Sequence, residues 1–260
     1  MSARYLRRAR PQLGTLVELG VRVPEAEPAR ATAALGRAFL ALAEVERALS
    51  AFLPESDIGR FNAAPAGFEV LLSDDAARVL GAACALARES AGLFDVSLGT
   101  GPGAWSLSEG EGGCRLRKHS PGVHLDLGGI GKGFAVDRAF EALFDELARG
   151  PEEPACWVNA GGDLRVSGVE LPVRLRDERG GGAFPFLVLS EGALATSRFG
   201  PLARASLAHA SPGHARYVSV AAPTGLLSDA LTKVVALCGR ADHPLLASHG
   251  ATAFIHEGGA

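Results

Sequence analysis

The sequence predicts an α+β fold. Residues 14–23 alternate between hydrophobic and other side chains, which is typical of a half-buried strand. Residues 28–51 carry hydrophobic side chains at helical spacing, which is typical of a helix with one face on a core. Along the rest of the chain the expected strands and helices mix without strict alternation. That pattern favours an α+β arrangement over a doubly wound parallel sheet.

A second helix and a glycine-rich loop are expected next. Ser73 is a good N-cap for a helix that starts at Asp74 and runs to Ser90, where Ala91-Gly92 ends it. Residues 99–113 contain six glycines and a proline, so we predict a loop there, placed around Trp105.

The second half of the chain predicts a series of strands and two helices. A short strand at 123–127 leads into a glycine-rich turn and then into a helix at about 132–148. A last helix is expected at 228–239, followed by a short helical segment. Because no linker clearly divides the chain, we expect one domain spanning residues 1–260. The remaining strands are expected at 155–159, 164–166, 172–176, 184–189, 217–221 and 251–256.

Composition narrows the function classes. A chain of 260 residues with 47% hydrophobic residues can bury a sizeable core. The formal net charge is −3 and no run of five like charges occurs, so the chain lacks the charge pattern of a protein that binds nucleic acid or an anionic membrane. No apolar stretch reaches the roughly 20 residues that a transmembrane helix needs. A small-molecule ligand or a protein partner is therefore expected, with no integral membrane segment.

Cysteines and the N-terminal region bear on the compartment. The four cysteines are widely spaced and form no C-x-x-C pair, so we expect free or buried thiols in a reducing compartment. Arginines near the N-terminus are followed by Gln12 and glycines rather than by a continuous apolar segment, so no secretion signal is expected. As the chain stands, these observations predict a cytoplasmic protein.

The glycine-rich turn Gly128-Gly-Ile-Gly-Lys-Gly133 is the strongest candidate for a phosphate site. Glycines allow a close backbone approach, the start of a helix offers unpaired N–H groups, and Lys132 adds a positive charge. A Walker A loop is excluded because Asp126 stands in place of its first glycine, and a Rossmann fingerprint fails at Phe134. A purely structural turn with a solvent-exposed lysine remains the alternative.

Six segments in order resemble the FAD:protein FMN transferase (ApbE) family. The closest match is His124-Leu-Asp-Leu-Gly-Gly-Ile-Gly-Lys-Gly-Phe-Ala-Val-Asp137. Each segment is a weak signal alone, but their order is hard to obtain by chance, and they cover nearly the whole chain. The other five are Leu13-Gly-Thr15, Ser50 to Asn62, Ser90 to Ser97 with Trp105 downstream, Val158-Asn-Ala-Gly-Gly-Asp163 and Ala195-Thr-Ser197.

The resemblance implies a fold and a reaction. The fold is an ApbE-like domain with a mixed, largely antiparallel sheet packed with helices. The reaction is attack by a Thr or Ser hydroxyl of an acceptor protein on the FMN phosphorus of FAD, with AMP leaving. A divalent cation, Mg²⁺, is expected on the diphosphate, where it neutralises developing charge. The implied partners are thus FAD, as donor substrate, and an acceptor protein.

Matching positions carry the family's roles over to this sequence. Asp229, in Ser228-Asp-Ala-Leu-Thr-Lys233, and the carbonyl of Gly131 correspond to metal ligands, and Asp229 and Lys132 are the catalytic candidates. Phe94 could equally be a core aromatic, and Asp163 could equally stabilise a turn. For Asp95 the alternative is a carboxylate at a helix end or turn. The cofactor-binding candidates are Phe94, Asp95, Gly129, Gly131, Lys132, Gly133, Asp163 and Thr196.

The chain departs from the family pattern at three places. Lys233 stands where the family has a metal-binding Thr, and Thr232 is rotated by roughly 100° around the helix, so it cannot replace that ligand. Arg198 stands where the family has Gly. The family's His-x-x-Asp-Pro segment is not recognisable before Val218, and we expect His209 and His214 to be loop residues.

These departures keep a second reading open, a non-catalytic or metal-independent FAD-binding protein of the same fold. A third possibility is a domain that has lost the ligand altogether. Members of the family are often exported as lipoproteins, but no cysteine precedes Cys84 here.

Overall fold

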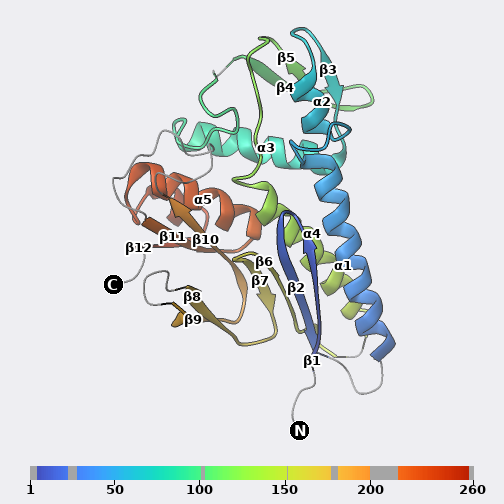
Figure 1. The fold of residues 1–260 in the computed structure, drawn as a ribbon, viewed down its shortest axis with the longest axis vertical. Coiled ribbons are helices and arrows are strands. Elements are labelled where there is room, and N and C mark those ends of the chain that lie inside the picture. Colours follow the sequence, from blue (N-terminus) through green and yellow to red (C-terminus); the bar gives the residue numbers. More distant parts are fainter. Residues whose placement is uncertain are drawn as a thin grey trace.

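A seven-stranded antiparallel sheet forms the centre of the molecule (Figure 1). The structure is a computed structural model that describes residues 5–22, 28–100, 103–150, 152–176, 181–199 and 216–257. Every neighbouring pair of strands in this sheet is antiparallel. The strand order is β1 (Tyr5–Gln12), β2 (Thr15–Arg22), β6 (Cys156–Ala160), β7 (Asp163–Ser167), β10 (Gly192–Phe199), β11 (Arg216–Ala222) and β12 (Thr252–Glu257).

Helices cover one face of this sheet (Figure 1). Helix α1 (Pro28–Leu49) lies beside α4 (Gly131–Leu147), and α4 in turn contacts α5 (Gly225–Cys238). The hydrophobic stripe of α1 is buried as predicted, and Val17, Leu19 and Val21 of β2 are fully buried in the same core. The helical and twofold periodicities in the sequence therefore identified the core-facing sides of α1 and β2.

A smaller unit lies above the central sheet in Figure 1. It contains a three-stranded sheet in the order β3 (Glu69–Leu71), β5 (Gly113–Lys118) and β4 (Trp105–Gly110), together with α2 (Asp57–Ala63) and α3 (Asp74–Glu89). Ser73 caps α3 by accepting the N–H of Ala76, as predicted. The fold class is the predicted α+β arrangement.

The prediction of a loop at 99–113 is wrong for residues 105–110 and 113, which lie in strands. Residues from Trp105 onward form β4, which turns into β5, and Leu107 pairs with Leu116 in the hairpin. The glycines do not disrupt regular structure here, because Gly112 and Gly113 have φ of 88° and 122° and supply the tight turn of that hairpin.

Other elements differ from the predicted ones. The strand expected at 123–127 is an extended segment outside any sheet, held by the Asn62 side chain at Leu125 and by a bond from Asp126 N–H to the Val96 carbonyl. Helix α5 begins three residues earlier than expected because Thr224 caps it. Besides β4, the elements that were not predicted from the sequence are β1, α2, β3, β5 and β10.

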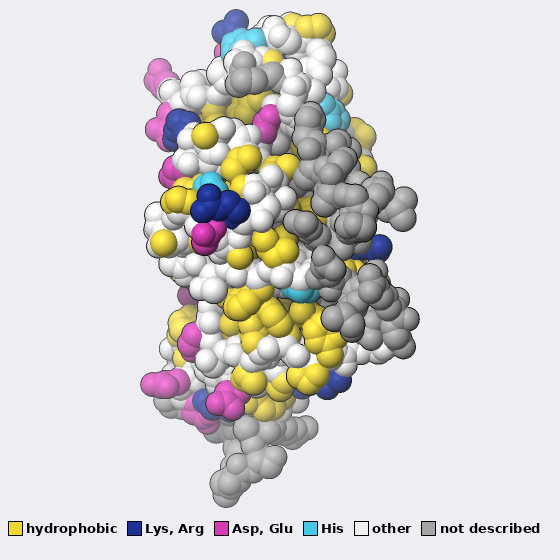
Figure 2. Space-filling model, turned by 90° about the vertical axis from the view of Figure 1, so that its left-hand side faces the viewer, with side chains coloured by type: hydrophobic (Ala, Val, Ile, Leu, Met, Phe, Trp, Pro, Cys, Tyr) yellow, Lys and Arg dark blue, Asp and Glu magenta, His cyan; other side chains and the backbone are white. Residues whose placement is uncertain are grey.

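A two-stranded hairpin packs against the other face of the central sheet. It consists of β8 (Leu171–Arg176) and β9 (Ala183–Leu189) and covers a second, smaller hydrophobic cluster that includes Trp157 and Leu194. Phe186 of β9 contacts Phe254 of β12 edge-on, with the ring centroids 5.2 Å apart. Hydrophobic side chains gather on the face shown in Figure 2, and Phe184, Val188 and Phe254 are among the exposed ones of the molecule.

Two further observations concern the thiols and the helices. All four cysteines are free, as expected. The last helix, α6 (Pro244–Ser248), is short, and none of the helices that the structure describes is long and apolar enough to span a bilayer.

Candidate functional site

The glycine-rich turn leads directly into the first turn of α4. Ile130 and Gly131 both donate their N–H groups to the carbonyl of Leu127, which closes the turn. Ile130 is the N-cap residue, and its side chain makes no capping hydrogen bond. The N–H groups at this helix start must therefore find partners elsewhere in the fold or in a ligand.

Helix α5 supplies one such partner because two glycines let it approach α4 closely. A Cβ atom on Gly133 would overlap the Gly225 carbonyl oxygen and lie 2.7 Å from the Cβ of Asp229. This contact brings the Asp229 carboxylate to the Gly133 N–H, which donates to Oδ2 at 3.1 Å. Asp229 thus caps the start of α4 from a neighbouring helix, where negative charge is favoured.

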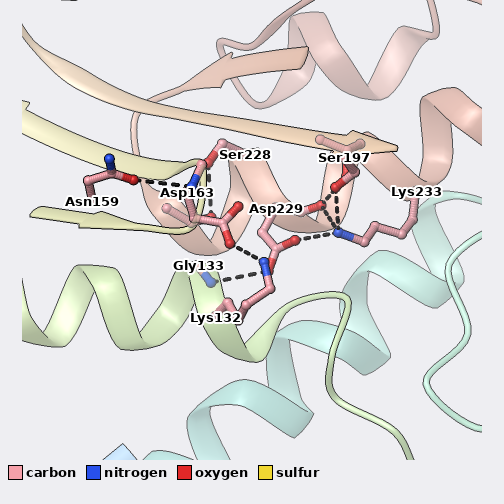
Figure 3. Close-up of polar contacts among 11 residues, drawn as sticks. Lys132, Gly133, Asn159, Asp163, Ser197, Ser228, Asp229 and Lys233 are labelled. Atoms are coloured by element: carbon pink, nitrogen blue, oxygen red, sulfur yellow. Dashed lines mark hydrogen bonds and ion pairs between the residues drawn. The ribbon is translucent and has the colours of Figure 1, made fainter. Parts of the chain in front are cut away.

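Asp229 forms a buried ion pair with Lys233, one helical turn later in α5. The ammonium of Lys233 contacts Oδ1 of Asp229 and also donates to the Asp229 carbonyl at 3.1 Å and to Ser197 Oγ at 3.2 Å (Figure 3). The Asp229 side chain is 0% exposed and that of Lys233 is 9% exposed. Both charges are therefore held inside the protein.

A second Lys–Asp pair lies beside the first (Figure 3). Lys132, from the first turn of α4, contacts Oδ2 of Asp163, the first residue of β7. The Asp163 side chain is 1% exposed, whereas that of Lys132 is 37% exposed. The preceding turn is held by Asn159, whose Oδ1 accepts the N–H of Gly162 at 3.1 Å. Only Lys132 of the four charged groups is substantially open to solvent.

The four charges shift the pKa values of the two carboxyl groups in opposite directions. Burial and, after it, the nearby charge of Asp229 raise the pKa of Asp163, Lys132 and Lys233 oppose the rise, and the resulting pKa is about 6. Burial also acts to raise the pKa of Asp229, but Lys233, then Lys132 and the Gly133 N–H, outweigh it and hold that pKa below its usual value. Near neutral pH the group carries two positive and two negative charges.

Asp137 positions the start of α5. Its carboxylate accepts the N–H groups of Gly225 and Leu226 at 2.7 and 2.8 Å and the guanidinium of Arg165 at 2.7 Å. Asp137 is buried on α4, and the chain passes from Gly225 to Asp229 within about one helical turn. The distance between α4 and the Asp229–Lys233 pair therefore depends on Asp137.

Segments that the resemblance singled out meet at this end of the sheet. Leu13 and Gly14, with φ of 55° and 68°, form the turn between β1 and β2. A Cβ on Gly161, which has a φ of 62°, would lie 3.1 Å from the Cβ of Thr15, so the turn before Asp163 packs directly on Thr15. Gly129 packs on the aliphatic part of Lys233, since a Cβ there would lie 3.2 Å from Lys233 Cε.

The structure does not bring Thr196 into the group of charges. Thr196 precedes Ser197 on β10, and neighbouring residues on a strand point to opposite faces. Ser197 faces α5, where it also accepts a bond from Thr232 at 3.0 Å. Thr196 instead bonds with Ser219 at 2.9 Å on the face that carries the β8–β9 hairpin, and lines a cavity of about 380 Å³ there with His256.

Phe94 and Asp95 have structural contacts. Phe94 is 4% exposed within the main core. Asp95 accepts the N–H and hydroxyl of Ser97 at 2.8 and 2.7 Å and the N–H of Gly99 at 2.9 Å, so its carboxylate organises a turn. Their predicted cofactor-binding roles remain predictions.

The remaining positions that the sequence analysis singled out are Gly131, Arg198 and two histidines. Gly131 is the first residue of α4, and its role as a metal ligand stays a prediction. Arg198 is exposed on β10 and pairs in register with Tyr217. His209 and His214 lie outside the described residues.

The residues around Asp229 do not fit Mg²⁺ in this arrangement. Mg²⁺ takes oxygen ligands in near-octahedral geometry. Both carboxylate oxygens of Asp229 are already used, by the Lys233 ammonium and by the Gly133 N–H. Within the described part of the chain, no group of three or more His, Cys, Asp and Glu side chains is arranged to hold a metal ion.

Sequence reasoning missed Ser197 and Asp137 as parts of this site. Both lay inside quoted segments, since Ser197 ends Ala195-Thr-Ser197 and Asp137 ends the longest match. Strand alternation on β10 could have shown that Thr196 and Ser197 cannot both face α5, but β10 itself was not predicted.

Comparisons with known proteins agree with this architecture. The fold is similar to that of the ApbE protein from Thermotoga maritima, with a TM-score of 0.77 and 21% identity over 99% of this chain and 96% of that chain. It is also similar to the flavinyl transferase ApbE of Pseudomonas stutzeri, with a TM-score of 0.76 and 21% identity over 98% of this chain and 91% of that one. The flavin transferase ApbE of Vibrio cholerae has a TM-score of 0.74 and 17% identity over 98% and 94% of the two chains.

A search of curated proteins finds no match. The model of the ApbE family matches residues 13–113 and 102–199, which together span most of the chain. The chain belongs to the ApbE family.

Proposed function

We propose that this protein binds FAD and transfers its FMN moiety to a Thr or Ser hydroxyl of an acceptor protein. One observation carries the proposal beyond family membership: Lys132, 37% exposed, stands at the glycine-rich start of α4 beside a second ammonium. A diphosphate is the ligand that such a helix start and two lysines favour.

The proposed reaction is a displacement at phosphorus. The acceptor hydroxyl oxygen forms a bond to the phosphorus of the FMN half of FAD, and the bond from that phosphorus to the oxygen it shares with AMP breaks. AMP leaves with that oxygen, and the hydroxyl proton is released to solvent. Lys132 would neutralise the charge that develops on the phosphoryl oxygens, and Asp229 would act by holding Lys233 in place.

The resemblance also implied Mg²⁺, and the residues present do not support that part of the proposal. Because Asp229 is engaged by Lys233 and Gly133, no step of the proposed reaction is assigned to a metal.

Mass spectrometry tests the transfer. The full chain is incubated with FAD and several Thr- or Ser-containing acceptor proteins, and the products are analysed for a covalent FMN adduct and for AMP. We expect an adduct on at least one acceptor and its loss in Lys132→Met, which keeps the length of the side chain and removes the charge. FMN and AMP without an adduct would mean that water is the acceptor, and no reaction with any acceptor would contradict the proposal.

The same fold could also bind FAD without transfer. The pairing of Asp229 with Lys233 favours this second function, because it removes the residue that the resemblance assigned to a metal. A rise in melting temperature with FAD, without any adduct or AMP, would identify it.

A further inference from the structure

Lys233 is the feature of this site that the proposed reaction does not explain. Its side chain leaves α5, passes over Gly129 of the glycine-rich turn, and ends against Asp229. Three oxygen atoms surround its ammonium: Oδ1 and the carbonyl of Asp229, and the hydroxyl of Ser197 (Figure 3). Carboxylate, carbonyl and hydroxyl oxygens form a set that would also suit a hard metal cation.

The ammonium has every contact that it needs to remain there. An ammonium can donate three hydrogen bonds, and Lys233 has three acceptors. Removing one partner of a buried ion pair leaves an uncompensated charge, so displacing the ammonium is costly. A divalent cation would have to expel Lys233 and would then add two positive charges beside Lys132.

We propose that the Lys233 ammonium occupies the position of a divalent cation at Asp229, so that this protein holds a diphosphate with two lysines and without a metal. The diphosphate part rests on the proposed function. Lys132 belongs to the glycine-rich turn, and the stem of Lys233 packs on Gly129 of the same turn, so both lysines lie at this turn. The second positive charge at the site is then part of the chain.

Metal binding by the flavin-free protein tests the first half of the proposal. Mn²⁺ is the probe, because it shares the oxygen preference of Mg²⁺ and is visible by electron paramagnetic resonance. We expect the wild-type chain to show no site that depends on Asp229. Lys233→Thr should create one Mn²⁺ site, and the double variant with Asp229→Asn should lose it.

Either of two results would overturn this half. One is a wild-type Mn²⁺ site that disappears in Asp229→Asn. The other is a folded Lys233→Thr protein that binds no Mn²⁺, since it would mean that Lys233 does not stand in a cation position. Circular dichroism and thermal melting establish that each variant is folded, and the wild-type titration decides the first result without any variant at Lys233.

FAD affinity with and without metal tests the second half. We expect the wild-type protein to bind FAD equally well in EDTA and in Mg²⁺. Lys233→Met, which keeps the stem on Gly129, should bind FAD about tenfold more weakly in both, because the variant removes a positive charge close to the diphosphate. Lys233→Thr should be weak in EDTA and recover in Mg²⁺. Strong Mg²⁺ dependence of the wild type would overturn the proposal.

The two halves fail separately. If the wild-type chain bound no FAD at all, the proposed function would be wrong. The Mn²⁺ titrations would still decide whether Lys233 occupies a cation position, because they contain no flavin.

Discussion

The two Lys–Asp pairs of the site have the same chemistry and different surroundings. In one, Lys132 is 37% exposed and Asp163 receives the ammonium from a helix start near solvent. In the other, Lys233 is 9% exposed, and Asp229 receives the ammonium together with the Gly133 N–H. The pKa of Asp163 is raised to about 6, and that of Asp229 is lowered.

Lys132 is therefore open to direct contact with a ligand, whereas the Lys233 ammonium is held in place by the fold and would act on a ligand through its charge. A carboxylate that accepts a backbone N–H and pairs with a buried ammonium is stable in its charged form. A buried carboxylate whose ammonium partner is exposed to solvent is less stable in its charged form. Changes at the two pairs should therefore have unequal effects.

Loss of Asp229 should be the most damaging single change. Asp229→Ala leaves the Lys233 ammonium buried without its carboxylate and leaves the Gly133 N–H without its acceptor. We expect a loss of about 3–5 kcal/mol in the free energy of unfolding, measured by urea denaturation.

Asp163→Asn is the matched change at the other pair. In the wild type, the pKa of Asp163 is higher in the folded state than in the unfolded state. Between these two pKa values the folded state binds more protons, so the stability of the wild type falls as the pH rises through that range. Above pH 6 the variant should be as stable as the wild type or more stable. Equal losses of stability in Asp229→Ala and Asp163→Asn would contradict the difference between the two pairs.

The close approach of α4 and α5 should depend on Gly133. A side chain there would overlap the Gly225 carbonyl and press on Asp229, so Gly133→Ala should cost about 3 kcal/mol. Gly36→Ala in α1, where nothing lies within 4 Å of the new Cβ, is the control and should stabilise the protein by about 0.5–1 kcal/mol. Thermal melting of both variants measures the difference, and a harmless Gly133→Ala would show that the helices can separate.

FAD affinity should rise as the pH falls through the pKa of Asp163. Protonation of Asp163 removes one negative charge, which changes the net charge of the two pairs from zero to +1 and favours an anionic diphosphate. Between pH 7.5 and 5.5 we expect roughly tenfold tighter binding, followed by fluorescence titration. Asp163→Asn should bind with the same affinity at both pH values; a wild-type affinity that does not change with pH would contradict the assignment.

The smallest effect should distinguish the two faces of β10. Ser197→Ala removes one acceptor from Lys233 and should weaken FAD binding by about fivefold, equivalent to about 1 kcal/mol. Thr196→Val, on the opposite face, should leave FAD affinity unchanged while breaking the bond to Ser219. The reverse result would restore the cofactor-binding role that the sequence predicted for Thr196.

Local sequence patterns predicted the elements with strong periodicity and missed the weak ones. Helices α1, α3 and α4 and strand β2 follow their hydrophobic spacing and caps. Strand β10 was missed because Gly192–Phe199 mixes small, polar and apolar residues and becomes a central strand only through its neighbours β7 and β11. The glycines at 110–113 were misread because a hairpin turn and an irregular loop use the same residues.

By itself the sequence determined the family, the fold class, the glycine-rich turn and the spacing that places Lys233 one helical turn after Asp229. These are local properties, or the order of local properties, along the chain. Tertiary structure alone decided that Asp229 caps α4, that Lys132 meets Asp163, and that Ser197 rather than Thr196 faces the charges. Those contacts join residues 31 to 96 positions apart. They exist only because Gly133 and Gly225 allow two helices to touch and the sheet brings β7 and β10 alongside them.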